Sequence, residues 1–278
     1  MRRIASGLIV IMSVLLVSCN GKTGNTITVG SDKLDNTQSY FSESMHKAAR
    51  CDSGYYYLDK CGASADNLMF YDDKSEESIV LCNKPQCGHD GEECMAYISG
   101  SEFKSELYYY NSYIYMISSK GNFVRISADG TQRTDLGSIC VLSGQDSVSM
   151  CFNDGYAYVS QEITGDIEGN VTVRLYRFNL DTGLSDKIYE ETGYGIGINS
   201  LKTYGSDTFF LKTSVSKDDK GLYSLEGKGI FRITGEDTEC LLDKNVYSYC
   251  IDADNNKLYY SGLGDGTIYE YDLGSGKS

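Results

Sequence analysis

Residues 107–130 read LYYYNSYIYMISSKGNFVRISADG, and this stretch decides the fold class. Apolar side chains such as Ile114 and Met116 recur at every second position, with Tyr, Ser or Asn between them, which is typical of β-strands. Asn111-Ser112 and Lys120-Gly121-Asn122 interrupt the alternation with residues that favour tight turns. The stretch therefore predicts three short antiparallel strands that follow one another along the chain.

Four further units with the same pattern can be laid over this one. Each unit closes its third strand with an apolar or aromatic residue, followed by a polar turn. These closing residues lie 38 to 55 positions apart and are Tyr71, Ile126, Phe178, Ile233 and Tyr271. Four short antiparallel strands at a period near 40–50 residues are the pattern of a β-propeller blade. We therefore predict an all-β protein, a β-propeller of about five four-stranded blades over residues 40–278, with a β-sandwich as the alternative.

The last unit has three recognisable strands and no fourth. One solution is that the segment around Ile27–Val29 supplies the missing strand and closes the ring. The other is that the chain is shorter than its relatives and that the ring stays open. A free blade edge would then expose unpaired backbone groups, which favour aggregation.

The composition supports an all-β fold and excludes some functions. The chain has 278 residues with 24 Tyr, 30 Gly, 1 Pro and no Trp, so the repeats are not WD repeats. The formal net charge is −14 and no basic patch interrupts it, which argues against a nucleic-acid partner.

The N-terminus carries an export signal. Arg2 and Arg3 precede an apolar run from Ile4 to Val17. As a helix this run spans about 21 Å, which is too short to cross a bilayer and typical of a secretory signal peptide. The following Leu16-Val17-Ser18-Cys19 resembles the lipobox of bacterial lipoproteins. That resemblance implies cleavage after residue 18 and attachment of diacylglycerol to the Cys19 sulfur.

These features divide the chain into a signal peptide (1–18), a lipidated cysteine with a polar, flexible tether (19–39) and the propeller (40–278). Acyl chains would hold the mature protein at a bilayer surface without crossing it. We therefore expect the membrane as a partner and the extracytoplasmic face of the cell membrane as the location.

A loop over residues 82–94, between the first two predicted blades, gathers soft metal ligands. Cys82, Cys87, His89 and Cys94 follow the spacing C-x4-C-x-H-x4-C, and the turns are expected at Pro85, Gly88 and Gly91. Three thiolates and one imidazole form a good tetrahedral set for structural zinc, although the spacing differs from the common C-x2-C knuckle. The alternative is one cysteine pair with one free thiol.

The six other cysteines of the propeller lie ten or eleven residues apart in three local pairs. The pairs are Cys51 with Cys61, Cys140 with Cys151, and Cys240 with Cys250. Such spacing permits disulfides across hairpins, provided that the Cα atoms come within about 7 Å. Buried free thiols that pack as small hydrophobes are the alternative.

The segment Leu81–Tyr97 carries the most specific resemblance in the chain. A Tyr-rich strand pair, then Leu-Cys-x-Lys-Pro-x-Cys-x-His, then Cys-x-Ala-Tyr resembles uncharacterised propeller lipoproteins of Gram-positive gut anaerobes such as clostridia. The Tyr-rich blades also resemble TolB-like and low-density-lipoprotein-receptor-like propellers in architecture, without the YWTD tetrapeptide. The resemblance implies the fold and the location, and it implies no activity.

No catalytic motif accompanies these features. The chain has two histidines and no Gly-x-Ser-x-Gly elbow, and paired carboxylates such as Glu190/Glu191 are predicted to lie in or beside turns. We therefore expect a binding module for an extracellular or cell-wall ligand, either a glycan or a protein, because Tyr combines apolar area with a hydroxyl. A polysaccharide-acting enzyme with an acidic pair at the propeller mouth and a structural or sensory partner of an envelope complex are the alternatives.

Overall fold

The computed structural model describes residues 48–99, 106–143, 146–165, 169–204, 207–235, 237–252, 254–262, 264 and 266–277. These residues form twenty β-strands and no helix, so none of them forms a helix that could cross a bilayer. The predicted signal peptide, the tether with Cys19 and the segment Ile27–Val29 lie outside the described residues.

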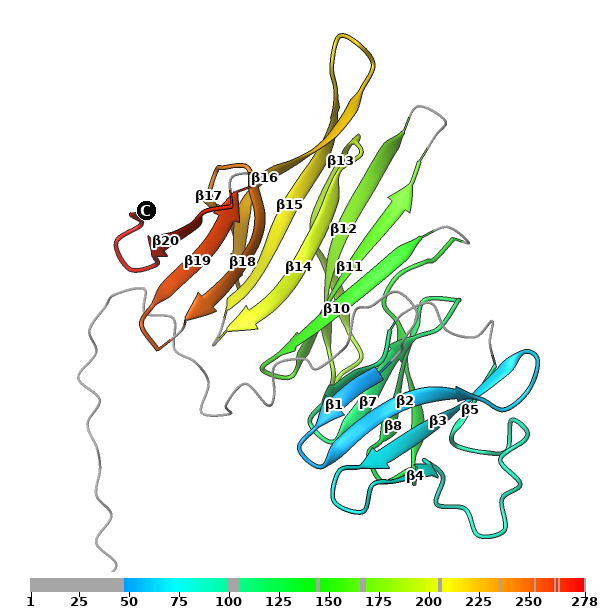
Figure 1. Cartoon of the computed structure of the whole chain (residues 1–278). Helices are drawn as coiled ribbons and strands as arrows, with labels where there is room; N and C mark the ends of the chain where they lie inside the picture. Colours follow the sequence, from blue (N-terminus) through cyan, green and yellow to red (C-terminus); the bar gives the residue numbers. More distant parts are fainter. Residues whose placement is uncertain are drawn as a thin grey trace, which may run out of the picture.

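The strands form five antiparallel sheets in chain order (Figure 1). The first contains β1 (Ala48–Cys51), β2 (Gly54–Lys60), β3 (Ala65–Asp72), β4 (Glu77–Val80) and β5 (Tyr97–Ser99). The second contains β6 (Tyr108–Tyr110), β7 (Tyr113–Ile117), β8 (Asn122–Ser127) and β9 (Arg133–Ser138). The third contains β10 (Ser147–Asn153), β11 (Tyr156–Thr164), β12 (Asn170–Asn179) and β13 (Ser185–Tyr194). The fourth contains β14 (Gly197–Tyr204), β15 (Asp207–Lys217), β16 (Tyr223–Thr234) and β17 (Asp237–Leu242), and the fifth β18 (Val246–Asp252), β19 (Lys257–Gly262) and β20 (Ile268–Asp272).

The predicted turns are formed by the residues that the sequence indicated. Asn111 and Ser112 both have positive φ (50° and 63°) between β6 and β7, as a two-residue hairpin turn of this hand requires. Strand β5 was not predicted. It returns from the loop and pairs with the start of β3, from Ala65 to Asn67, while β4 pairs with the end of β3.

Successive side chains on the inner sheets enter different cores. Ile114 and Met116 pack with the first sheet, whereas Tyr115 and Ile117, on the same strand, pack with the third sheet. The four buried clusters lie between sheets one and two, two and three, three and four, and four and five. Each inner sheet is therefore apolar on both faces, as blades stacked around an axis require.

The five sheets follow one another along an arc, from β1–β5 at one end to β18–β20 at the other (Figure 1). First strands of neighbouring sheets lie beside each other, as β10 does to β14. Within the described residues no strand of the last sheet pairs with the first. After β20 the chain turns back so that Lys277 forms a bridge with Asp272, where the other sheets begin their fourth strand.

Candidate metal centre

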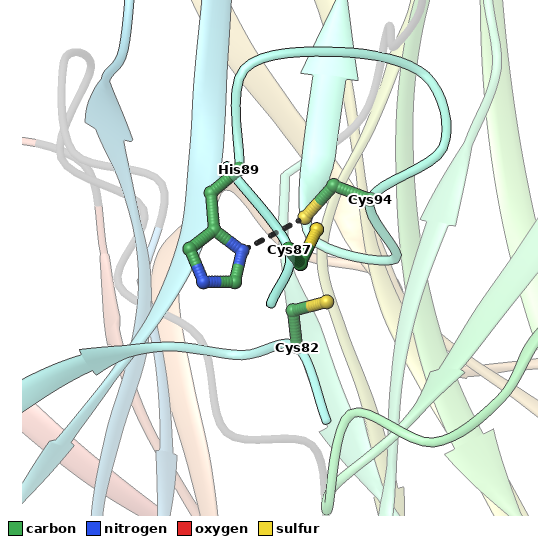
Figure 2. A group of neighbouring side chains, drawn as sticks. All are labelled: Cys82, Cys87, His89 and Cys94. Carbon is green, nitrogen blue, oxygen red and sulfur yellow. Dashed lines mark hydrogen bonds between the residues drawn. The ribbon is translucent and has the colours of Figure 1, made fainter. Parts of the chain in front are cut away.

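The structure brings the four predicted metal ligands together. The ligand atoms of Cys82, Cys87, His89 and Cys94 all lie within 4.8 Å of one another, and the His89 Nδ1 is 3.3 Å from the Cys94 Sγ (Figure 2). Of the described residues, no other group of His, Cys, Asp and Glu side chains is arranged in this way. The prediction of a four-residue cluster in this loop is therefore confirmed.

The loop reaches this geometry through residues other than the two predicted glycines. Positive φ occurs at Gln86 (60°) and at His89 (57°), and not at Gly88 or Gly91. The left-handed conformation costs a residue with a side chain on the order of 1 kcal/mol, although His tolerates it better than most. His89 therefore adopts the left-handed backbone conformation at a small cost in free energy.

Backbone hydrogen bonds fold the loop tightly around the cluster. The Cys87 N–H donates to the Lys84 carbonyl (3.3 Å), and the Cys94 N–H donates to the Gly91 carbonyl (2.9 Å). The ammonium of Lys84 donates to the Glu93 carbonyl and so ties the two arms of the loop together. The two backbone bonds each link residues three positions apart, and the Lys84 bond links residues nine positions apart across the loop.

Both arms of the loop are fastened to a single residue of the first sheet. The Leu68 N–H donates to the Ala96 carbonyl (2.8 Å), and the Leu68 carbonyl accepts from the Leu81 N–H (2.9 Å). Cys94 is buried in the first core, and Cys82 and Cys87 pack against that core. The cluster therefore lies between a rigid strand and the loop that it closes.

Backbone N–H groups donate hydrogen bonds to the sulfurs of Cys82 and Cys94. Burial opposes ionisation of Cys82, but N–H groups of Lys84 and Met95 donate to its sulfur, and the net effect lowers the pKa of Cys82. Burial raises the pKa of the Cys94 thiol to about 12, despite a hydrogen bond from the Ala96 N–H. A cation would favour the thiolate at both positions.

The donor set fits zinc. Zinc–thiolate bonds of about 2.3 Å place the ligand atoms of a tetrahedron ~3.8 Å apart. The four ligand atoms lie within 4.8 Å of one another, so they need to move only slightly closer together to bind zinc. All four positions are filled by side chains, and amide donors to the sulfurs supply the outer hydrogen bonds that such centres use. The cluster can hold a metal ion, and its four ligands leave no open position for a substrate.

In the structure the other six cysteines are free thiols and form none of the disulfides that the sequence left open as one of two alternatives. Cys51 lies opposite Gly54 at one end of β2, and Cys61 follows the other end, so about 20 Å of strand separates them. Cys140 packs in the core between sheets two and three, whereas Cys151 points into the core between sheets three and four. The first pair therefore exceeds the ~7 Å limit between Cα atoms. The side chains of the second pair lie in different cores, so neither pair can form a disulfide.

The third pair is also unbonded. Cys240 lies on β17 and Cys250 on β18, which belong to different sheets, and both side chains are exposed. Of the six, Cys51, Cys140 and Cys151 are buried, so the alternative of thiols packed as small hydrophobes describes half of the set.

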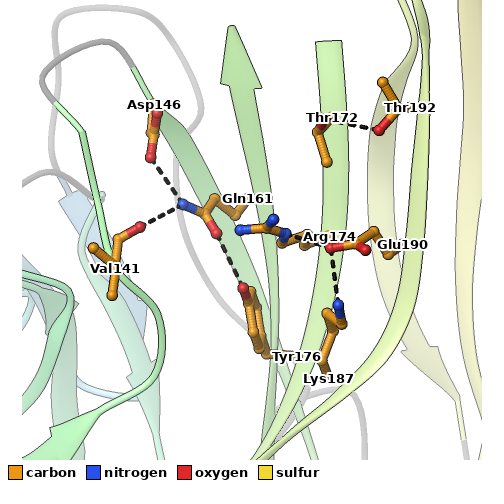
Figure 3. Close-up of polar contacts among 9 residues, drawn as sticks. All are labelled: Val141, Asp146, Gln161, Thr172, Arg174, Tyr176, Lys187, Glu190 and Thr192. Atoms are coloured by element: carbon orange, nitrogen blue, oxygen red, sulfur yellow. Dashed lines mark hydrogen bonds and ion pairs between the residues drawn. The ribbon is translucent and has the colours of Figure 1, made fainter. Parts of the chain in front are cut away.

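Glu190 and Glu191 were predicted to lie in or beside a turn, but they lie within β13. Glu190 and Glu191 are neighbours on β13 and therefore point to opposite faces of the sheet. Glu190 pairs with Arg174 (2.6 Å) and Lys187 (2.9 Å) on one face (Figure 3), and Glu191 pairs with Lys212 (2.5 Å) on the other. Lys187 and then Arg174 lower the pKa of Glu190, so this carboxylate stays ionised and paired.

A buried amide organises the polar residues beside this ion pair. The Gln161 side chain is fully buried, and its Nε2 donates to the Val141 carbonyl (2.9 Å) and to the Asp146 carboxylate (2.8 Å) (Figure 3). Its Oε1 accepts from the Tyr176 hydroxyl (3.3 Å). Because these groups satisfy one another, the network holds Val141 and Asp146 beside β11.

Exposed apolar side chains gather at one place that the sequence did not indicate. Strands β15 and β16 project beyond the neighbouring sheets (Figure 1). Their tip and the end of β13 carry Tyr194, Leu222, Tyr223 and Leu225, with exposed fractions of 38% to 66%. We call these four residues the hairpin patch.

The two tyrosines of the hairpin patch support each other. The rings of Tyr194 and Tyr223 are stacked with centroids 6.1 Å apart and planes 19° apart, and the Lys217 ammonium lies 5.2 Å from the centre of the Tyr223 ring. A Cβ on Gly169 would lie 2.8 Å from the Tyr194 ring, so the ring packs on bare backbone there. The patch is thus a fixed aromatic surface facing water.

Known structures resemble this chain in fold. The puromycin hydrolase structure matches 83% of this chain with a TM-score of 0.52 and 12% identity. An oligogalacturonate lyase from Vibrio parahaemolyticus (9% identity, 92% of this chain, 85% of that chain) and BamB from Moraxella catarrhalis (12%, 81%, 69%) match at TM-scores of 0.34 and 0.33. The chain spans 38% of the puromycin hydrolase chain.

Sequence comparison adds no relative. No protein-family model matches the chain, and no curated protein matches it significantly. At 12% identity, the likeness to puromycin hydrolase concerns the fold alone. The sheet order, the shared cores and this likeness identify the chain as an all-β protein of the β-propeller type with five blades, the last of three strands in the part that is described.

Proposed function

We propose that this protein is a lipid-tethered binding module, whose propeller presents the hairpin patch to a glycan or protein ligand outside the cytoplasmic membrane. The observation that supports the proposal is the patch itself. Its four large apolar side chains are exposed, whereas the other aromatic residues on the strands of the same two sheets are buried or half-buried. Rigid tyrosines that combine apolar area with a hydroxyl are common in surfaces that bind sugars and proteins.

The lipid tether is proposed from the sequence. Leu16-Val17-Ser18-Cys19 resembles a lipobox, and the polar residues 20–39 suit a spacer between the bilayer and the propeller. We expect Cys19→Ala to release the protein from the membrane fraction into the medium. Retention of this variant in the membrane fraction would contradict the proposed lipid anchor.

Loss of aromatic surface tests the binding proposal. We expect the double variant Tyr194→Ala/Tyr223→Ala to lose binding in co-sedimentation with purified cell-wall sacculi and with a panel of insoluble polysaccharides. Tyr247→Ala is the matched control, because this tyrosine is 63% exposed on β18, away from the hairpin patch. If the wild-type protein binds to sacculi but to none of the polysaccharides, the ligand would be a protein bound to the cell wall. Equal binding by both variants would reject the patch.

We also propose that Cys82, Cys87, His89 and Cys94 hold a structural zinc ion. A bound zinc ion would close the loop by linking residues that are up to twelve positions apart, and it would supply no catalysis because no ligand position is open. Native mass spectra of the full chain in detergent should show one zinc-mass adduct that denaturation removes. The His89→Ala variant should lack the adduct, and a wild-type chain without it would contradict this proposal.

A further inference from the structure

We infer that metal binding in the Cys/His loop is coupled to the docking of the second sheet on the first, through the turn between β8 and β9. The inference rests on the proposed zinc centre. It concerns Gly130 and its neighbours, which are not metal ligands and lie about 40 residues beyond the loop in the sequence. They act as positioning residues for the ligand Cys82.

The turn contacts the loop where the first ligand leaves β4. The Asn83 N–H donates to the Gly130 carbonyl (3.2 Å). A Cβ on Gly130 would lie 2.7 Å from the Leu81 carbonyl oxygen and 3.0 Å from the Cys82 nitrogen. The backbone of the turn therefore presses against the backbone on both sides of Cys82, and a methyl group has no room between them.

Two side chains hold the same pair of sheets together around this contact. The Tyr56 hydroxyl donates to the Ala128 carbonyl in the turn (3.2 Å). On the opposite arm, the Arg133 Nη1 donates to the Tyr97 carbonyl at the start of β5 (2.8 Å). The second sheet thus holds the chain just after Cys82 and three residues after Cys94, the first and the last ligand.

This arrangement makes metal affinity depend on docking. A tetrahedral centre tolerates displacements of only a few tenths of an ångström in its ligands, so the chain around Cys82 must stay where the turn holds it. Because linkage is reciprocal, zinc must in turn stabilise the docked sheets. The metal would therefore fasten two blades, and not only the loop that provides its ligands.

The chain offers a matched control for Gly130. Gly235 occupies the turn between the third and fourth strands of the fourth sheet and has φ of +65°, close to the +68° of Gly130. A Cβ on Gly235 would meet no atom within 4 Å. Substitution by Ala therefore strains both backbones alike, and only at Gly130 does it push against a metal ligand.

The first experiment measures zinc affinity of the full chain in detergent by competition with a chelating dye. We expect Gly130→Ala to weaken zinc binding by about 10-fold or more, which is the range for residues that orient ligands, and Gly235→Ala to leave it unchanged. The cobalt absorption spectrum of each variant checks that three thiolates still bind. Equal affinities for the two variants would overturn the coupling while leaving the zinc centre intact. A wild-type chain that binds no zinc would remove both.

A second measurement does not depend on a folded variant. Amide hydrogen exchange of the wild-type chain is compared with and without zinc. Zinc should slow exchange at Asn83 and also at Thr131 and Gln132, whose N–H groups are bonded within the β8–β9 turn. The turn at Gly235 should be unaffected. Protection confined to residues 82–96 would overturn the inference.

Discussion

At the residue scale, one side chain organises the largest aromatic cluster. Phe152 is 1% exposed, and the rings of Tyr108, Tyr110, Tyr115 and Phe123 lie with their centroids 4.8 to 6.3 Å from its own. These partners all come from the second sheet, so Phe152 joins the second sheet to the third. The Tyr108 hydroxyl also accepts a hydrogen bond from the Met150 N–H (3.1 Å).

We expect Phe152→Ala to lower the free energy of unfolding by about 3–5 kcal/mol, because it removes buried area and leaves a cavity among rings that cannot close together. Urea denaturation measures the change. Tyr247→Ala, on an exposed position, should change the free energy by less than about 0.5 kcal/mol. Similar losses in both variants would mean that the cluster contributes little.

Glu162 predicts a specific dependence of stability on pH. Its carboxylate accepts hydrogen bonds from the Ile198 N–H (3.0 Å) and the Ser147 hydroxyl (3.4 Å), but burial is the larger effect and raises its pKa above the ordinary 4.5. A raised pKa means that the folded state holds the proton longer than the unfolded state. The stabilising contribution is therefore present at low pH and is lost as the pH rises through the folded pKa.

We expect Glu162→Gln to remove this loss, because an amide has no charge to bury and its oxygen can still accept from Ile198. The free energy of unfolding of the variant, relative to the wild type, should increase between about pH 4 and about pH 7. Urea titrations across this range measure it. A constant difference would show that Glu162 does not titrate in this range.

The clustering of Cys82, Cys87, His89 and Cys94 could be predicted from the sequence, but the residues that position them could not. Thiol and imidazole side chains at short spacing indicate a metal because their chemistry is local. The role of Gly130 depends on how two sheets pack, and its sequence context, Ala-Asp-Gly, indicates only a turn. The positive φ at Gln86 and His89 was missed for a related reason, since nearby glycines are the better local candidates.

At the scale of single elements, alternation of apolar residues predicted most strands and the turns between them. It did not predict β5, whose three residues are too short to show a period and whose partner lies about thirty residues earlier. It also did not predict how far β15 and β16 extend beyond the core. Beyond Thr213 the two strands stay paired while their residues are half-buried or exposed, so full burial ends before the strands do.

The turn between β7 and β8 offers a test at this scale. Gly121 has φ of +83°, and a Cβ there would lie 1.8 Å from the Cys140 carbonyl oxygen, just after β9. Its own carbonyl accepts from the Ile139 N–H (3.0 Å). The turn and the end of the last strand of this sheet therefore pack backbone against backbone.

We expect Gly121→Ala to cost the ~1 kcal/mol of left-handed strain and about 1–3 kcal/mol more, because β9 must move away from the turn. Gly155→Ala is the control, since Gly155 has φ of +78° and open space around it. Chemical denaturation of both variants separates strain from contact. Equal losses of unfolding free energy in the two variants would mean that the chain after β9 can move away from the turn without a measurable loss of stability.

At the scale of the whole molecule, the repeat predicted five blades and a last sheet of three strands, and the described residues confirm both. The arc could not be predicted in the same way, because the repeat reports how strands pair and not how many sheets complete a ring. The projecting hairpin patch belongs to this scale too. It combines residues from two sheets, and its two tyrosines, Tyr194 and Tyr223, lie about thirty positions apart in the sequence.

Metal removal gives the molecular prediction. If zinc occupies its site at ~100 times its dissociation constant, it stabilises the fold by about 2.7 kcal/mol. For a domain of this size, chelation or His89→Ala should then lower the melting temperature by about 5–10 °C. Calorimetry with and without a chelator measures the shift. A wild-type melting temperature that ignores the chelator would mean that the loop is stable without metal.

The order of the sheets has a consequence for how the chain folds. Every described strand pairs with a strand next to it in the chain, except β5, which reaches back only to β3. Contacts of such short sequence separation lower the entropy of loop closure that folding must overcome, and they favour rapid folding. A chain that emerges N-terminus first would complete the sheet with the Cys/His loop before the later sheets are available. Each later sheet would then pack onto the apolar face of the sheet that formed before it.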